Sequence, residues 1–202
     1  MMDESILLFI QEHIRCAELD PFMIFITHTG DYGILCIVVA VILLLIPKTR
    51  RLGNVLAASL LIEFIINNGI IKNVVARTRP YYVIDELKLM IEEQPDFSFP
   101  SGHAGITFAF AGAFLFAMIF GIPGFSESVK FKAVTIAVLI YAELLAFSRL
   151  YVGVHYPTDV LGGIAIGLAT AMAGYFIEGR LRPWVLEKNA KRKAAKSVSS
   201  AE

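Results

Sequence analysis

The sequence predicts an all-α fold, a polytopic transmembrane helical bundle with five to six membrane helices. Two observations predict it. Hydrophobic residues make up 56% of the 202-residue chain and charged residues only 18%, a balance outside the usual range of soluble domains. The apolar residues also gather into segments that approach the roughly 20 residues a helix needs to cross a bilayer. Positive and negative side chains are equal in number, 18 each, so the composition indicates no nucleic acid partner.

Residues 1–29 predict an amphipathic or interfacial N-terminal element. Apolar side chains recur at helical spacing between Ser5 and Leu19, and such a helix lies on the membrane surface or packs on the bundle. Asp20 and Pro21 end this helix, because proline lacks a backbone N–H and breaks the hydrogen-bond ladder. A short apolar stretch follows, and whether this element makes a sixth span is left open.

Five longer apolar segments predict the membrane helices of the main domain, residues 30–179. They are Tyr32–Ile46, Leu52–Val75, Gly102–Phe120, Val129–Phe147 and Pro157–Ile177. The first is short unless the preceding apolar stretch extends it. Glycines in the last segment predict close helix packing.

Residues 180–202 form a polar tail rich in Lys, Ala and Ser, expected to be a frayed helix end or disordered. If the spans alternate, this tail and most of the other Lys and Arg residues lie on one side of the bilayer. The excess of basic residues predicts that this side is cytoplasmic. The opposite end of the bundle then faces outward.

Three polar patches are expected at the outward ends of the spans. They are Lys72 with Arg79-Pro80, then Pro100-Ser101-Gly102-His103, and then Ser148-Arg149 with His155 and Asp159. Each residue alone has an ordinary interpretation. Lys72 can snorkel to the interface, Ser101 and Asp159 can cap helices, and Arg149 can anchor a helix end.

Together the patches favour a phosphate site. Lys72, Arg79 and Arg149 bring three cations to one region, where their repulsion calls for an anion between them. Arg presents a fork of donors that matches phosphate oxygens, and Lys adds a point charge. Ser101 and Gly102 stand at a helix N-terminus, which favours anion binding.

Two histidines can supply the chemistry. Asp159 follows His155 by four residues, so the carboxylate can fix the tautomer of the imidazole and leave its other nitrogen free to attack. His103 on another helix can protonate the leaving oxygen. No carboxylate cluster indicates a metal, so neither a metal ion nor any other cofactor is expected, and residues 30–179 become the expected catalytic domain.

These motifs resemble those of the type 2 phosphatidic acid phosphatase superfamily, which includes the vanadium haloperoxidases and glucose-6-phosphatase. The resemblance rests on K-x6-R-P from Lys72, P-S-G-H from Pro100, and S-R-x5-H-x3-D from Ser148. It implies His155 as nucleophile with Asp159 as its partner, and His103 as general acid. It also implies that Lys72, Arg79, Ser101, Gly102 and Arg149 hold the phosphoryl oxygens.

The resemblance implies a lipid phosphatase of the bacterial cytoplasmic membrane, with its site facing outward and its tail in the cytoplasm. Its partners would be the bilayer and a phosphorylated lipid, with undecaprenyl diphosphate placed first and phosphatidylglycerophosphate or phosphatidic acid next. A vanadate-dependent oxidoreductase and a non-catalytic lipid-binding protein are the alternatives. The segment 81–99 is expected to be an amphipathic lid or a solvated interfacial helix. The sequence does not indicate an oligomeric state.

Polar residues within the spans are expected to support the site or the fold. Asn68 lies one helical turn before Lys72 and can support it. Glu143 lies on the outward half of its span and can steady a catalytic cation, while Glu63 is expected to hydrogen-bond between helices. His13 and His28 are expected to have no chemical role.

Overall fold

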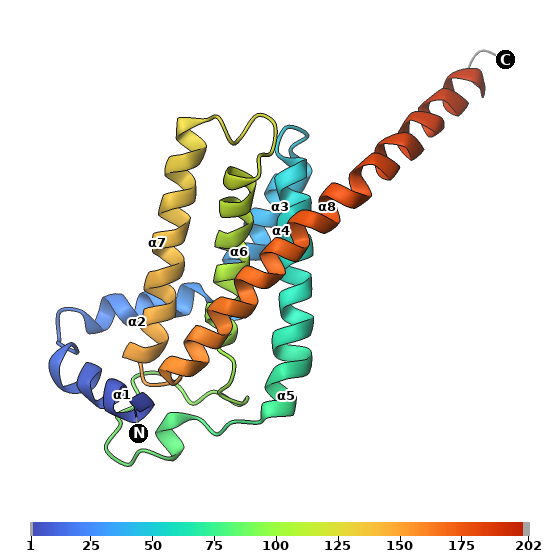
Figure 1. Ribbon diagram of the computed structural model, residues 1–202. Coiled ribbons are helices and arrows are strands. Elements are labelled where there is room, and N and C mark those ends of the chain that lie inside the picture. Colours follow the sequence, from blue (N-terminus) through green and yellow to red (C-terminus); the bar gives the residue numbers. More distant parts are fainter. Residues whose placement is uncertain (1, 200–202) are drawn as a thin grey trace.

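The computed structural model describes residues 2–199, which form an all-helical protein. The elements are α1 Met2–His13, α2 Asp20–Thr29, η1 Asp31–Gly33, α3 Ile34–Leu45, α4 Arg50–Glu63, η2 Phe64–Ile71, α5 Lys72–Val75, η3 Pro80–Tyr82, α6 Gly102–Ile119, α7 Val129–Tyr151 and α8 Pro157–Ser199. The long helices stand side by side, and the N-terminal helices lie across one end of them (Figure 1). The prediction of an all-α bundle is confirmed.

Four stretches are long and apolar enough to cross a membrane: Arg50–Tyr82, Gly102–Ile119, Val129–Tyr151 and Pro157–Lys188. A fifth arises if Asp20–Thr29 and Asp31–Leu45, bent by 42°, count as one span. Many large apolar side chains on these helices face outward, as expected for helices surrounded by lipid. The N-terminal helix α1 is not among the candidate spans.

Helix α6 forms the centre of the bundle, packed against α4, α7 and α8. Its crossing with α8 is close because glycines line the α8 side. A Cβ on Gly163 would lie 2.5 Å from the Ser101 carbonyl oxygen, and one on Gly167 would lie 2.4 Å from that of Gly105. This crossing confirms the expected role of the glycines, and it fixes the start of α6 beside the start of α8.

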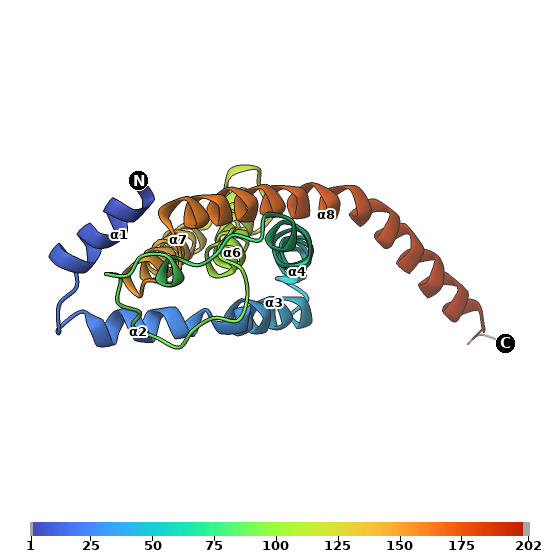
Figure 2. The same ribbon diagram turned by 90° about the horizontal axis from the view of Figure 1, so that it is seen from below.

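Helix α1 packs on the bundle at this same end, as Figure 2 shows from below. It ends at His13, earlier than the sequence predicted, and its buried Leu7 packs with Ile84, Leu87 and Tyr156. The segment 83–101 contains no helix, so the alternative of a solvated interfacial helix is wrong, and the amphipathic lid stays a prediction. Its apolar side chains Ile84 and Leu87 instead pack against Leu7 of α1.

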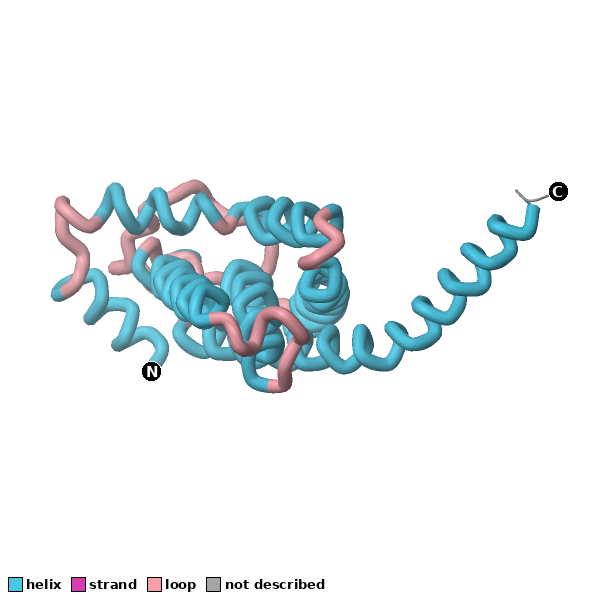
Figure 3. Tube along the Cα trace, turned by 90° about the horizontal axis from the view of Figure 1, so that it is seen from above, coloured by secondary structure: helices cyan, strands magenta, loops and turns pink. Residues whose placement is uncertain are grey.

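Helix α8 continues well beyond the bundle and extends away from it (Figure 3). It passes the expected domain boundary at residue 180 and includes Pro183. The described part of the expected tail is therefore helical, and residues 200–202 lie outside the described range.

Candidate active site

The three polar patches meet at one end of the bundle, where α5 ends, α6 and α8 begin, and α7 ends (Figure 1). The side chains concerned are buried although they are polar. The six polar side chains that line this end are at most 6% exposed: Lys72, Arg79, Ser101, Arg149, His155 and Asp159. Buried polar groups are costly unless they bind one another or a ligand, so this concentration marks a binding site.

His155 lies at the centre of this site and is 1% exposed. Its Nδ1 lies 3.5 Å from Asp159 Oδ2, and its Nε2 lies 3.4 Å from Arg79 Nη1. Burial lowers the pKa of His155 well below 6.5, and the charges of Arg79, Arg149 and Lys72 lower it further. The imidazole is therefore neutral at physiological pH, which is the form that can act as a nucleophile.

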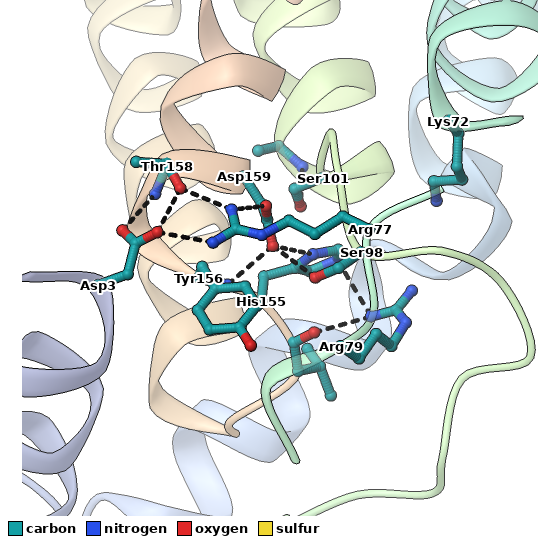
Figure 4. Close-up of polar contacts among 12 residues, drawn as sticks. Asp3, Lys72, Arg77, Arg79, Ser98, Ser101, His155, Tyr156, Thr158 and Asp159 are labelled. Carbon is teal, nitrogen blue, oxygen red and sulfur yellow. Dashed lines mark hydrogen bonds and ion pairs between the residues drawn. The ribbon is translucent and has the colours of Figure 1, made fainter. Parts of the chain in front are cut away.

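Asp159 is held by more groups than the sequence indicated. It accepts hydrogen bonds from Ser98 Oγ at 2.5 Å, from the Tyr156 N–H at 2.9 Å and from Arg77 Nη1 at 2.6 Å. Arg77 also donates through Nη2 to Asp3 Oδ2 of α1 at 2.8 Å. Figure 4 shows this network beside His155. Sequence analysis missed Arg77, which lies within the first motif at one of its unspecified positions.

Lys72 and Arg79 share a carboxylate that sequence analysis also missed. Asp96 Oδ2 lies 2.5 Å from Lys72 Nζ, and Oδ1 lies 2.5 Å from Arg79 Nη2. Partial burial alone would raise the pKa of Asp96, but the hydrogen bonds and charges of Lys72 and Arg79 lower it to about 2. Lys72 thus points into the site, and the interpretation of a snorkelling lysine is wrong.

Arg149 is 1% exposed, which excludes the interpretation of an interfacial anchor. Its Nη1 donates to Thr27 Oγ1 of α2 at 2.6 Å. Its Nε and Nη2 find no hydrogen-bond acceptor among the described residues. A buried guanidinium with two unused donors is costly, and a phosphate would satisfy both with its oxygens.

His103 is held from the N-terminal part of the chain. Its Nε2 lies 3.0 Å from Asp31 Oδ1, and Asp31 Oδ2 lies 2.9 Å from the exposed His28 Nδ1. Asp31 therefore joins the general-acid candidate to a second histidine. His28 thus contacts the site through Asp31, although the sequence predicted no chemical role for it.

The start of α6 supplies the remaining cradle residues. Ser101 Oγ caps the helix by accepting from the Ala104 N–H at 3.4 Å, so its ordinary interpretation holds alongside its place in the site. A Cβ on Gly102 would lie 3.1 Å from Asn68 Oδ1 and 3.8 Å from Lys72 Nζ. Asn68 and Lys72 thus converge on the glycine, and the absence of a Cβ keeps this space open.

Two further polar residues of the spans differ in their surroundings. Glu143 is exposed on α7, and no ion pair joins it to a cation within residues 2–199. The expected contact between Glu143 and a catalytic cation is therefore not found. Glu63 is fully buried, accepts a hydrogen bond from Asn67 Nδ2 at 2.6 Å, and lies against Gly105 of α6. This hydrogen bond stays within one continuous helix, and Glu63 Oε2 finds no partner among the described residues, so the expected hydrogen bond between helices is not found, although the side chain is buried against α6.

Across the described chain, no group of three or more His, Cys, Asp or Glu side chains is arranged to hold a metal ion. The arrangement can bind a phosphoryl group, present a neutral imidazole to it and offer a second imidazole for proton transfer.

A family model described as the PAP2 superfamily matches residues 48–183. An undecaprenyl-diphosphatase of Sulfolobus acidocaldarius is 32% identical over 76% of this chain and 68% of its own length. Undecaprenyl-diphosphatase BcrC of Bacillus subtilis is 29% identical over 84% of this chain and 80% of its own. Phosphatidylglycerophosphatase B of Bacillus subtilis is 32% identical over 50% of this chain and 46% of its own.

Two solved structures share the fold. A transmembrane PAP2-type phosphatidylglycerolphosphate phosphatase from Bacillus subtilis superposes with a TM-score of 0.71 at 27% identity, covering 89% of this chain and 86% of that one. LpxE from Aquifex aeolicus superposes with a TM-score of 0.69 at 22% identity, covering 86% of this chain and 94% of that one.

Proposed function

Because the chain belongs to the PAP2 superfamily of membrane lipid phosphatases, we propose that it removes a terminal phosphate from a lipid through a phosphohistidine on His155. The observation that carries the proposal is the position of His155, a neutral imidazole beside Arg79 and within the field of Arg149 and Lys72. A nucleophile surrounded by cations in a desolvated site matches the charge of a phosphoryl-transfer transition state.

In the first step, Nε2 of His155 attacks phosphorus while the Asp159 carboxylate, 3.5 Å from Nδ1, stabilises the positive charge that develops on the ring. The bond from phosphorus to the leaving oxygen breaks, and His103 transfers a proton to that oxygen. Lys72, Arg79 and Arg149 bind the equatorial oxygens, and the N–H groups at the start of α6 assist them. For a diphosphate lipid the leaving group is the lipid monophosphate.

In the second step, His103 accepts a proton from water as the water oxygen attacks phosphorus. The phosphorus–nitrogen bond then breaks, which releases inorganic phosphate and restores His155. No step requires a metal ion, because the side-chain cations neutralise the transferring group. We therefore propose a metal-independent hydrolase.

Undecaprenyl diphosphate is the first candidate substrate. Two relatives that match 76% and 84% of this chain bear the name undecaprenyl-diphosphatase, while the matching phosphatidylglycerophosphatase aligns over half of it. The excess of basic residues at the opposite end of the bundle supports an outward-facing site in a bacterial cytoplasmic membrane. A carrier lipid diphosphate exposed on that leaflet would reach this site.

The test is phosphate release by purified protein in detergent, with EDTA present, from undecaprenyl diphosphate, phosphatidylglycerophosphate and phosphatidic acid. We expect turnover of at least one lipid, fastest with the diphosphate, and loss of turnover in His155→Ala with normal helical content. Normal turnover by His155→Ala would exclude the mechanism. Turnover that stops in EDTA and returns with a metal would exclude metal independence, and halide oxidation only with added vanadate would favour the oxidoreductase.

A further inference from the structure

The phosphate-binding cations hold one of the protein's own carboxylates. Asp96 bridges Lys72 and Arg79, and Arg79 Nε also donates to the Asp96 backbone oxygen at 2.8 Å. The side chains differ greatly in exposure: 7% for Lys72 and 3% for Arg79, but 48% for Asp96. The carboxylate therefore reaches the buried cations from the exposed side of the site.

The backbone around Asp96 is anchored although it forms no helix. The Ser98 N–H donates to the Arg77 oxygen at 2.8 Å, and Tyr81 Oη binds the Gln94 backbone on the other side of Asp96. The Asp96 side chain can therefore turn toward water without movement of the whole segment. Arg149 differs from Lys72 and Arg79, because its Nε and Nη2 donate to no carboxylate within the described chain.

We propose that Asp96 is a specificity-determining residue, an internal competitor that a dianionic terminal phosphate displaces and a monoanionic phosphodiester does not. This inference rests on the proposed function, since it concerns which phosphates enter that same site. Discrimination of this kind works by making the wrong ligand compete with a contact the protein already has.

The charges explain the selectivity. Displacement of Asp96 removes one negative charge from Lys72 and Arg79 and replaces it with the charge of the ligand. A phosphate monoester or a terminal diphosphate group carries close to two negative charges at pH 7, because its second pKa is about 6. It therefore gains Coulomb energy over the carboxylate. A phosphodiester carries one charge and gains none.

The membrane makes this selectivity useful. Phosphodiester headgroups surround the protein at a high local concentration, and each could otherwise bind a cradle of three cations. A carboxylate already bound there keeps these bulk lipids out, while a rare lipid with a terminal phosphate still enters.

Three variants test the inference: Asp96→Asn, which removes the charge, Asp96→Glu, which keeps it, and Asp85→Asn, which removes an exposed charge from the same segment. Binding of inorganic phosphate and of short-chain phosphatidylglycerol is measured by calorimetry in detergent, without turnover. We expect Asp96→Asn to bind phosphatidylglycerol about tenfold more tightly than the wild type does. Asp96→Glu and Asp85→Asn should bind it as the wild type does.

Unchanged phosphatidylglycerol affinity in folded Asp96→Asn would overturn the inference. Weaker phosphate binding by the same variant would also overturn it, because Asp96 would then be a permanent support of the cradle. These binding results are independent of hydrolysis. A wild type that binds phosphate but hydrolyses no lipid would refute the proposed function, whatever the three variants show.

Discussion

The two histidines of the site each contact a carboxylate, but the two carboxylates differ in burial and in their number of partners. Behind His155, Asp159 is fully buried and bound by Arg77, Ser98 and a backbone N–H. Behind His103 stands Asp31, which is 40% exposed and bound to the exposed His28. A buried carboxylate with several partners is rigid and costly to disturb, whereas a half-exposed carboxylate contributes less because water screens it.

The difference matches the two proposed tasks. A nucleophile must be held in line with phosphorus, because a small displacement costs a large part of the rate. A general acid gives up a proton and takes one back in each cycle, so contact with a half-exposed carboxylate and with water suits it. We infer that the rigid, buried Asp159 supports the histidine that forms the bond to phosphorus. The half-exposed Asp31 supports the histidine that transfers the proton.

The largest expected effect separates the two histidines. His155→Gln should lower kcat by roughly 10⁴-fold or more, since the covalent route is lost. His103→Gln should lower kcat by about 10²- to 10⁴-fold, the usual contribution of general acid–base catalysis. Both are measured by phosphate release with lipid substrate.

A second substrate sharpens this comparison. An aryl phosphate with a good leaving group needs little protonation, so His103→Gln should lose much less activity with p-nitrophenyl phosphate than with lipid. His155→Gln should lose as much with both. The same pattern for both variants would contradict the assignment of separate roles.

Arg77 should give the next largest effect. A hydrogen bond to a charged group contributes about 1.5–3 kcal/mol, so Arg77→Ala should lower kcat by about 10- to 100-fold if that energy positions Asp159. KM should change little, because Arg77 does not touch the cations of the cradle. Arg77→Lys should restore part of kcat. A loss expressed only in KM would show that Arg77 binds substrate instead.

The sequence predicted those residues whose neighbours are set by helical spacing or by a motif. His155 and Asp159 are four residues apart, and Ser101 precedes a helix, so local geometry was enough to place them. Membrane-length segments with basic residues at one end similarly indicated the bundle. Each of these predictions depends only on the sequence close to the residue concerned.

The residues that sequence analysis missed are distant along the chain or depend on helix rotation. Asp96 lies 24 residues after Lys72, in a segment without periodicity, and Asp31 lies 72 residues before His103. No local pattern predicts such pairs. The expected role of Glu143 required a side chain that faces the site, but the face of α7 on which it lies depends on packing, and that face is exposed. The π-helix η2 also changes the helical face just before Lys72.

The smallest expected effect concerns Asp31. Asp31→Asn keeps the size of the side chain and removes its charge, so His103 loses the support of a carboxylate but remains in place. We expect kcat for the lipid to fall by about tenfold or less, because a half-exposed charge contributes about 1 kcal/mol. Activity toward p-nitrophenyl phosphate should stay nearly constant, because that leaving group does not need the proton. Glu18→Gln, an exposed carboxylate of the same N-terminal region, serves as the matched control. If Asp31→Asn lowers both activities equally, the carboxylate supports the fold and not the acid, and the contrast between the two histidines fails at this point.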